Sequence, residues 1–312
     1  MKFLVAGGAG FLGSNLCEQL LKMGHQVTAV DNLITGRNKN IVYLQQFEDF
    51  SFINHDIVEY RDFEVDGIFN LACPASPPLY QKDPVRTVKT NVIGSTNLLE
   101  LARKTSSRIL QASTSEIYGD PKVSPQTEEY WGNVNPVGLR SCYDEGKRTA
   151  ETLFMDFHRQ YGTDIRIARI FNTYGPRMSI DDGRVVSNFI VQSLTNKDLT
   201  IYGNGEQIRS FCYVDDLING LIKLFFKENC YYPINMGNPD PINMEDLALE
   251  IIKLTKSESK ITRMPLPSDD PITRIPDISK AIDQLNWNPS INRIEGLKKT
   301  IEYFSKELNI EL

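Results

Sequence analysis

A glycine-rich turn directly after the first apolar segment places the strongest constraint on how this chain can fold. Residues 1–13 read MKFLVAGGAGFLG, so a short strand runs into Gly7, Gly10 and Gly13, and a helical pattern follows. Glycine lets the backbone bend sharply and approach a pyrophosphate, whose charge is stabilised by the N–H groups at the start of a helix. The sequence therefore predicts a dinucleotide-binding turn.

An acidic residue after the second strand supports this interpretation. Asp31 lies 18 residues after Gly13, near the spacing of about 20 residues for a carboxylate that binds an adenosine ribose. The carboxylate would repel a 2′-phosphate, so NAD is favoured over NADP, although nearby Arg37 weakens this preference. A strand–turn–helix without a ligand is the structural alternative.

Short apolar runs alternate with helical patterns over the first part of the chain. This alternation predicts an α/β fold with a Rossmann-type, doubly wound parallel sheet. The candidate strands are residues 3–6, 27–30, 52–53, 68–71, 109–110 and 165–168. We expect an NAD-binding domain over 1–171, to which the chain returns around 209–235, and a smaller α/β lobe over 172–312 that binds substrate.

Two helices are marked clearly by local sequence. Asp83 can cap a helix whose first residue is Pro84. Apolar residues spaced by three and four positions predict a late helix over residues 294–308.

Composition and charge exclude several classes of protein. The net charge of -6 argues against a nucleic-acid surface, and no apolar run of about 18 residues could span a membrane. The five cysteines form no Cys-x-x-Cys pair, and the three histidines are far apart, so we expect free thiols and no metal site. We therefore expect a soluble, cytoplasmic protein.

The pattern Tyr-x-x-x-Lys occurs twice, and its context separates the two copies. Tyr118 and Lys122 enclose a glycine and a proline, which oppose a helix. Tyr143 and Lys147 lie in a helical pattern, so both side chains share one face. An ammonium beside a nicotinamide cation would lower the phenol pKa from its usual value of about 10. We assign Tyr143 and Lys147 to catalysis and the other copy to loop structure.

Polar residues also follow the buried strand near residue 110. Thr114, Ser115 and Glu116 arrive together where that strand should end. They are either ordinary polar residues of a loop or catalytic groups. For Thr114, the alternative to a catalytic role is a hydroxyl that caps the end of the strand.

Together these features resemble the extended short-chain dehydrogenases/reductases that modify sugar nucleotides, and most closely the UDP-glucuronate decarboxylases. The resemblance covers essentially the whole chain. It rests on CPASPP (73–78), STSEIYGDP (113–121), NPVGLRSCYDEGKR (135–148), RIFNTYGPRM (169–178), DGRVVSNFI (182–190), YGNGEQIRSFCYVDDL (202–217) and DDPITRIPDISKA (269–281).

The resemblance implies a reaction without net redox change. Thr114 would bond a sugar C4 hydroxyl, Tyr143 would remove its proton, and NAD would accept the hydride. The resulting β-keto acid loses CO₂, and UDP-glucuronate becomes UDP-xylose after C5 is protonated and C4 is reduced again. Ser115 and Glu116 would lie beside the sugar carboxylate, and Arg274 would approach from the C-terminal lobe.

The resemblance leaves the proton donor to C5 open between Glu116 and Arg274, although a guanidinium is a poor acid because its pKa exceeds about 12. An ion pair of Arg274 with Asp269 or Asp270 is the structural alternative to a catalytic role.

The resemblance further implies two sets of binding residues and a homodimer that contacts its partner through helices around 84–104 and 143–161. The expected cofactor contacts are Gly7, Gly10, Phe11, Leu12, Gly13, Asp31, Asn32, Arg37, Asp56, Ile57, Leu71, Ala72, Thr90, Ala112, Tyr143 and Lys147. The expected UDP-sugar contacts are Ser76, Asn172, Arg184, Asn188, Tyr202, Gln207, Arg209 and Arg274.

Two alternatives remain at this point. A UDP-sugar 4-epimerase or 4,6-dehydratase could share the scaffold, but Ser115, Glu116 and Arg274 argue against both. A protein that senses NAD or a sugar nucleotide without catalysis is the other alternative, since a fold alone does not establish an activity.

Overall fold

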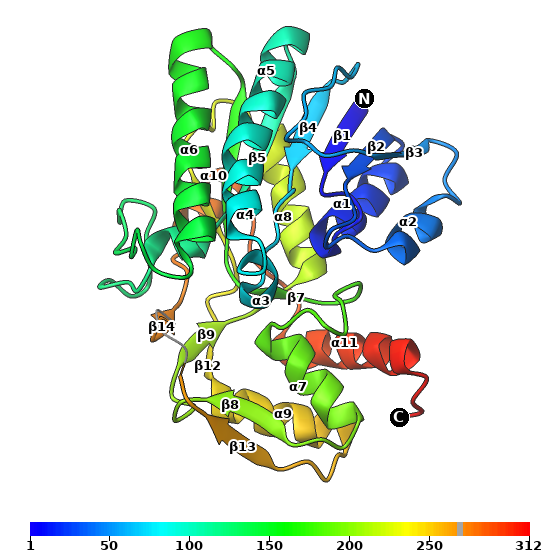
Figure 1. The fold of residues 1–312 in the computed structure, drawn as a ribbon, viewed down its shortest axis with the longest axis vertical. Coiled ribbons are helices and arrows are strands. Elements are labelled where there is room, and N and C mark those ends of the chain that lie inside the picture. The colour runs from blue at the N-terminus through cyan, green and yellow to red at the C-terminus, as the bar shows by residue number, and fades with distance from the viewer. Residues whose placement is uncertain (267–270) are drawn as a thin grey trace.

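A seven-stranded parallel sheet organises the N-terminal lobe of the computed structural model, which describes residues 1–266 and 271–312 (Figure 1). Every strand pair in this sheet is parallel. In spatial order the strands are β11 (Ile234–Met236), β6 (Ile165–Ile170), β5 (Arg108–Thr114), β4 (Gly67–Asn70), β1 (Lys2–Ala6), β2 (Gln26–Asp31) and β3 (Phe50–Asn54). The strand order reverses between β1 and β4, where ligands bind at the carboxyl ends of such sheets.

The sheet confirms the predicted fold class, and six of its strands overlap the apolar runs chosen from the sequence. Strand β1 shows why these runs are continuous rather than alternating. Phe3 and Val5 pack into the core on one face of the sheet, while Leu4 and Ala6 pack into the core on the other. A strand buried on both faces needs apolar residues at every position.

Helices cover both faces of the sheet (Figure 1). On the Phe3 face, helix α1 (Phe11–Lys22) packs against α8 (Val214–Phe226), and their leucines share the larger core. On the Leu4 face lie α4 (Pro84–Lys89), the π-helical turn η1 (Thr90–Gly94), α5 (Ser95–Thr105) and α6 (Ser141–Tyr161). The shorter helices of this lobe are α2 (Asn38–Leu44), α3 (Pro77–Tyr80) and η2 (Ser115–Tyr118).

The helix start predicted at Asp83 and Pro84 is present in the structure. The Asp83 carboxylate accepts the N–H of Arg86 at 3.0 Å, and Pro84 is the first residue of α4. Helix α6 ends at Gly162, which has φ +70°. This left-handed conformation is the usual end of a helix and favours glycine.

The C-terminal lobe is smaller and mixed (Figure 1). Strand β9 (Ile208–Ser210) lies between β12 (Pro241–Asn243) and β14 (Thr273–Arg274), and β8 (Leu199–Tyr202) pairs with β13 (Ile261–Met264). Its helices are α7 (Val185–Leu194), α9 (Met244–Thr255) and the predicted late helix, α11 (Arg293–Leu308).

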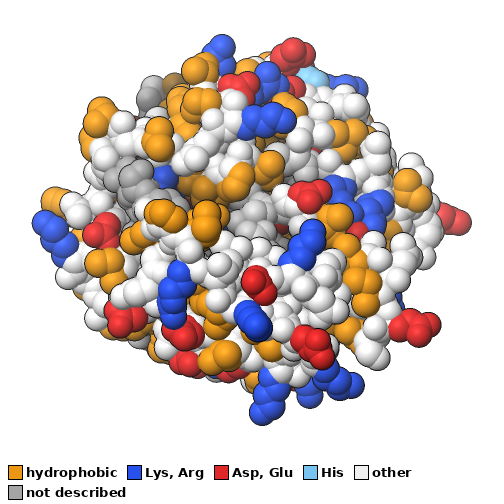
Figure 2. All heavy atoms as spheres, turned by 60° about the horizontal axis from the view of Figure 1, so that its bottom comes forward, with side chains coloured by type: hydrophobic (Ala, Val, Ile, Leu, Met, Phe, Trp, Pro, Cys, Tyr) orange, Lys and Arg blue, Asp and Glu red, His pale blue; other side chains and the backbone are white. Residues whose placement is uncertain are grey.

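Some segments connect the two lobes. Strand β7 (Thr173–Tyr174) pairs with β10 (Cys212–Tyr213), α8 and β11 return the chain to the N-terminal lobe, and α10 (Ser279–Leu285) packs on both of them. Figure 2 shows the molecule with the C-terminal lobe turned toward the viewer, and acidic and basic side chains are interspersed on this face. No helix of the described residues has the length and apolar character needed to cross a bilayer.

Candidate active site

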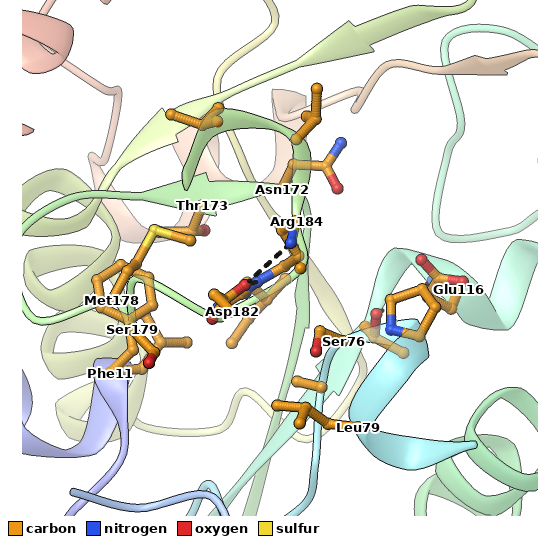
Figure 3. Close-up of a pocket in the computed structure, with 18 of the residues that line it drawn as sticks. Phe11, Ser76, Leu79, Glu116, Asn172, Thr173, Met178, Ser179, Asp182 and Arg184 are labelled. Carbon is orange, nitrogen blue, oxygen red and sulfur yellow. Dashed lines mark hydrogen bonds and ion pairs between the residues drawn. The ribbon is translucent and has the colours of Figure 1, made fainter. Parts of the chain in front are cut away.

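A cavity of about 710 Å³ lies at the carboxyl ends of the sheet strands and is bounded by both lobes. Figure 3 shows Glu116 and Ser76 at one side of this cavity and Phe11, Met178 and Ser179 at the other. The predicted site residues that line it are Gly7, Gly10, Phe11, Leu12, Gly13, Arg37, Leu71, Ser76, Ala112, Thr114, Ser115, Glu116, Tyr143, Lys147, Asn172, Arg184, Asn188, Tyr202, Gln207, Arg209 and Arg274. Among the described residues, no group of side chains could hold a metal ion.

The glycine turn has no room for side chains. A Cβ on Gly13 would lie 2.0 Å from the carbonyl oxygen of Gly7, and a Cβ on Gly7 would lie 2.8 Å from the backbone of Leu71. Gly7 also has φ +79°, which favours glycine. Because the first N–H groups of α1 have no partner within the helix, the turn fits a pyrophosphate at close range.

Asp31 contacts the glycine turn but does not itself line the cavity. Its carboxylate accepts the N–H of Ala9 at 3.0 Å and the N–H of Leu33 at 2.8 Å. Burial raises the pKa of Asp31, and the two N–H donors act against that shift. The carboxylate therefore fixes the loop after β2 against the turn, at the place where a ribose would bind.

Five other predicted cofactor residues also lie outside the cavity lining. Asn32 donates to the carboxylate of Asp56 at 2.8 Å, and Asp56 forms an ion pair with Arg86. Thr90 donates to the carbonyl oxygen of Arg86 at 3.0 Å. These contacts join the loops around the end of the cavity where the adenosine is expected. The remaining two residues are Ile57, which is buried beneath Gly94, and Ala72, whose N–H is bonded to Asn70.

Tyr143 and Lys147 share one face of α6 at the bottom of the cavity. The Lys147 ammonium donates to the carbonyl oxygen of Ala112 at 2.8 Å and lies 5.8 Å from the centre of the Tyr143 ring. Burial lowers the pKa of Lys147. Burial also raises the pKa of Tyr143, while a hydrogen bond with Thr114 acts in the opposite direction. The protein side chains alone therefore do not lower the pKa of the Tyr143 phenol.

The other Tyr-x-x-x-Lys copy has a structural role, as predicted. Tyr118 is buried, donates to the Asn235 side chain at 2.8 Å, and accepts from Arg169 at 3.0 Å. The 3₁₀ turn η2 ends at Tyr118, and Gly119 has φ +62°, so Lys122 lies in a loop rather than on a shared helix face.

The side chain of Glu116 lies between two arginines. One of its oxygens forms an ion pair with Arg140 and the other with Arg274 (these three residues are called the Glu116 cluster below). Burial alone would raise the pKa of Glu116, but the two guanidinium groups outweigh it and lower the pKa to about 2. Glu116 is therefore ionised at neutral pH.

Arg274 retains unused donors inside the protein. It is only 3 % exposed, and its Nε and Nη2 atoms are buried without a hydrogen-bond partner among the described residues. Asp269 and Asp270, the alternative partners considered from the sequence, lie outside those residues. The Nε–Nη2 edge of a guanidinium is a planar fork that matches the two oxygens of a carboxylate.

Three of the expected UDP-sugar contacts already have protein partners. Arg184 donates to Asp182 through two nitrogens at 2.5 and 2.8 Å (Figure 3), and Asn188 donates to the carbonyl of Gly183 at 3.1 Å. Gln207 donates to the carbonyl of Tyr202 at 2.8 Å.

Other polar groups near these residues differ in how they are satisfied. Arg209 donates to the backbone carbonyls of Ile208 and Ile272 at 3.0 and 3.1 Å, and thereby helps to hold β9 against β14. The hydroxyl of Ser76 and the Gln207 side-chain oxygen are buried without a hydrogen-bond partner among the described residues. Both atoms lie on residues that line the cavity, where a ligand could satisfy them.

Three residues of this region were missed from the sequence. Arg140 lies directly before α6 and completes the Glu116 cluster, and Asp144 follows Tyr143 on the helix. The ring of Tyr80 stacks on Tyr143 with 5.0 Å between centroids and 6° between planes. A cation three residues before Tyr143 was the available signal for Arg140, while nothing local identified Tyr80.

Comparisons with known proteins agree with this architecture. Residues 3–237 match the model of the NAD dependent epimerase/dehydratase family. The chain is 52 % identical over 307 residues to UDP-glucuronic acid decarboxylase 1 of Xenopus tropicalis, covering 98 % of this chain and 73 % of the relative. It is 52 % identical over 311 residues to UDP-glucuronic acid decarboxylase 3 of Arabidopsis thaliana, covering 99 % and 91 %.

Solved structures are similar over nearly the full length. UDP-glucose 4-epimerase from Thermotoga maritima, solved with UDP-glucose, has a TM-score of 0.90 at 30 % identity and covers 99 % of this chain and 100 % of its own. UDP-glucuronic acid 4-epimerase from Bacillus cereus, in complex with UDP-glucuronic acid and NAD, has a TM-score of 0.90 at 29 % identity, with coverage of 98 % and 100 %.

Proposed function

This chain belongs to the NAD-dependent epimerase/dehydratase family, and from that premise we propose that it decarboxylates UDP-glucuronate to UDP-xylose. The observation that carries the decarboxylation is Arg274, a residue of the cavity lining whose Nε and Nη2 atoms are buried without a partner among the described residues. A sugar carboxylate satisfies the Nε–Nη2 edge, whereas a neutral hexose leaves it unpaired at a cost of roughly 1–3 kcal/mol. The relatives at 52 % identity carry the name of this activity.

We infer that the cofactor is NAD. The glycine turn and the first turn of α1 would hold its pyrophosphate, and Asp31 disfavours a 2′-phosphate. When bound, NAD⁺ accepts a hydride from the sugar C4 and later returns it, so the cycle has no net redox change.

Tyr143 and Thr114 act on the C4 hydroxyl. The Tyr143 phenolate takes the hydroxyl proton, and the Thr114 hydroxyl keeps the oxygen within reach. The buried Lys147 ammonium stabilises the phenolate through the charge that it places 5.8 Å from the ring. At the end of the cycle Tyr143 returns the same proton to the C4 oxygen.

Loss of CO₂ follows from the ketone at C4. The C5–C6 bond electrons move into the ketone and form an enolate, whose oxygen is bonded by protonated Tyr143 and Thr114. One proton from solvent must then reach C5 for each CO₂ released. Because Glu116 is ionised beside two guanidinium groups, we propose that it orients a water, and that this water delivers the proton.

We also propose a cytoplasmic homodimer. The five cysteines are free, which suits a reducing compartment. Exposed Val85, Val88 and Ile93 recur along α4 and η1, in the segment expected from the family resemblance to contact a partner.

The decisive experiment incubates purified protein with UDP-glucuronate without added NADH and follows CO₂ and the nucleotide sugars by mass spectrometry. We expect CO₂ and UDP-xylose, and neither product from Tyr143→Phe. A new sugar of unchanged mass would instead support the epimerase alternative. Bound NAD without any turnover would support the sensor.

A further inference from the structure

Asp144 is a buried carboxyl group that the reaction described above does not use. It follows Tyr143 on α6, is 6 % exposed, and does not line the cavity. Its N–H donates to the carbonyl oxygen of Arg140 at 3.1 Å, so Asp144 follows Arg140 of the Glu116 cluster by one helical turn, a spacing that puts the two residues on the same side of α6. Its Oδ1 atom is buried without a hydrogen-bond partner among the described residues.

Charged and titratable groups face Asp144 from several elements. They are Glu116 on η2, Arg274 on β14, Arg140, Cys142, Tyr143 and Glu145 at the start of α6, and Tyr80 on α3. Among the charges, Glu116 acts most strongly on Asp144 and opposes its ionisation, while the two arginines favour it.

The geometry favours a protonated Asp144. An ionised carboxylate needs donors for both oxygens, and a charged oxygen that is buried without a donor is strongly disfavoured. Burial, followed by the negative charge of Glu116, raises the pKa of Asp144 to about 8. The group is therefore mostly neutral at pH 7 and titrates within the range in which the protein can be assayed.

We propose that Asp144 is a positioning residue that sets the affinity of the Glu116 cluster for the substrate carboxylate. While neutral, it leaves Glu116 as the fixed anion of the cluster, and Arg274 can bind the sugar carboxylate. When ionised, it adds a second fixed anion that repels that carboxylate. This inference rests on the proposed function, because it assumes a UDP-hexuronate in the cavity.

The sign of the pH effect follows directly. The protonated form of Asp144 binds the uronate, so binding favours the proton, and affinity is lost as pH rises through the pKa of about 8. UDP-glucose carries the same nucleotide and diphosphate but no carboxylate. Its affinity should therefore be insensitive to Asp144.

The test measures dissociation constants of UDP-glucuronate and UDP-glucose by calorimetry between pH 6.5 and 9, in the Tyr143→Phe background that prevents turnover. We expect the dissociation constant of UDP-glucuronate to rise about tenfold from pH 7 to 9, and that of UDP-glucose to change less than about twofold. Asp144→Asn should remove the difference by keeping UDP-glucuronate binding tight at pH 9. Glu145→Gln removes the adjacent carboxylate, which is 37 % exposed, and should retain the wild-type pH response.

Two results would overturn the inference: the same pH response for both ligands in the parent protein, or a response that survives in Asp144→Asn. If Asp144→Asn does not fold, the comparison of the two ligands in the parent still decides. Failure of the proposed function looks different, since the wild-type protein would then release no CO₂ from UDP-glucuronate at pH 7.

Discussion

At the scale of single residues, the site divides into two neighbouring sets of side chains with opposite charge properties. Thr114, Tyr143 and Lys147 belong to the proposed position of the sugar C4, and burial shifts the tyrosine and the lysine toward their neutral forms. Glu116 and its two arginines remain charged despite burial, because each charge is paired. In the proposed reaction, hydride chemistry and carboxylate binding thus use different electrostatic environments within one cavity.

Tyr143→Phe tests the first set. Removing the phenol oxygen should reduce CO₂ release by about 10²–10⁴-fold, because the proposed base for the C4 proton is then lost. The ring still stacks on Tyr80, so the fold and the affinity for UDP-glucuronate should be retained. Initial rates and calorimetric binding measure the two effects separately. Unchanged turnover would remove Tyr143 from the reaction.

Arg274→Lys tests the second set. Lysine keeps the charge but loses the planar fork, so we expect CO₂ release to fall about 10²-fold or more and the KM for UDP-glucuronate to rise. UDP-glucose affinity should change little. The matched control is Arg263→Lys in the same lobe, where an exposed arginine pairs with Glu245. Equal losses of affinity for both sugars would mean that Arg274 does not recognise the carboxylate.

At the scale of elements, the structure shows which parts the sequence predicts well. Strands such as β1 and β5 contain apolar runs that fit burial on both faces, and the cap at Asp83 acts locally. Strand β11 was not predicted, because it has only three residues and includes Asn235, whose amide is satisfied by Gln126 and Asp277 far away in sequence.

The same difference between local signals and contacts distant in sequence explains which residues of the site could be predicted. Tyr143 and Lys147 share a helix face, so their pairing follows from spacing. The contacts of Glu116 with Arg140 and Arg274 depend on how the loop before α6 and strand β14 fold back, which no local pattern specifies. Without the family resemblance, Arg274 would have been one arginine among many.

Helix α11 joins the C-terminal lobe to the loop that borders the adenosine end of the cavity. Glu307 forms ion pairs with Arg37 and Lys39, and Arg37 also donates to the Met178 carbonyl at 3.0 Å. Glu307→Gln should speed NAD dissociation several-fold and lower stability by about 0.5–1 kcal/mol. Cofactor fluorescence after dilution and thermal unfolding measure these changes.

The pH dependence of this contact gives a second check. Burial alone would raise the pKa of Glu307, but Lys39 and Arg37 outweigh it and lower the pKa. The stabilising contribution of Glu307 is therefore present above its unfolded pKa and is lost as pH falls through its folded pKa. In acid, the stability of Glu307→Gln should therefore resemble that of the wild type. Glu302→Gln, at an exposed pair with Lys306 on the same helix, is the matched control and should behave as wild type.

At the scale of the whole molecule, neither lobe forms the cavity alone. The N-terminal sheet contributes the glycine turn, Glu116 and Tyr143, and the C-terminal lobe contributes Arg274 and most of the expected nucleotide contacts. Relative movement of the lobes would therefore change the reacting end and the nucleotide end together.

The proposed homodimer makes a prediction at this scale. Light scattering should give twice the chain mass of 35.5 kDa. Val85→Asp combined with Val88→Asp should shift the protein toward monomer, because both side chains are exposed on α4 and their burial would drive association. Leu249→Asp on α9, at a position 51 % exposed, should leave the mass unchanged. A monomeric wild-type protein would contradict the proposal.

The position of Arg274 late in the chain has a consequence for synthesis. The ribosome makes the glycine turn, Tyr143 and all seven strands of the sheet before it reaches β14, and N-terminal parts generally fold first. Until β14 emerges, β9 lacks one of its two neighbours, and Glu116 lacks one of its two cations. A nascent chain therefore holds the elements proposed to bind the dinucleotide before it holds the arginine proposed to bind the uronate carboxylate.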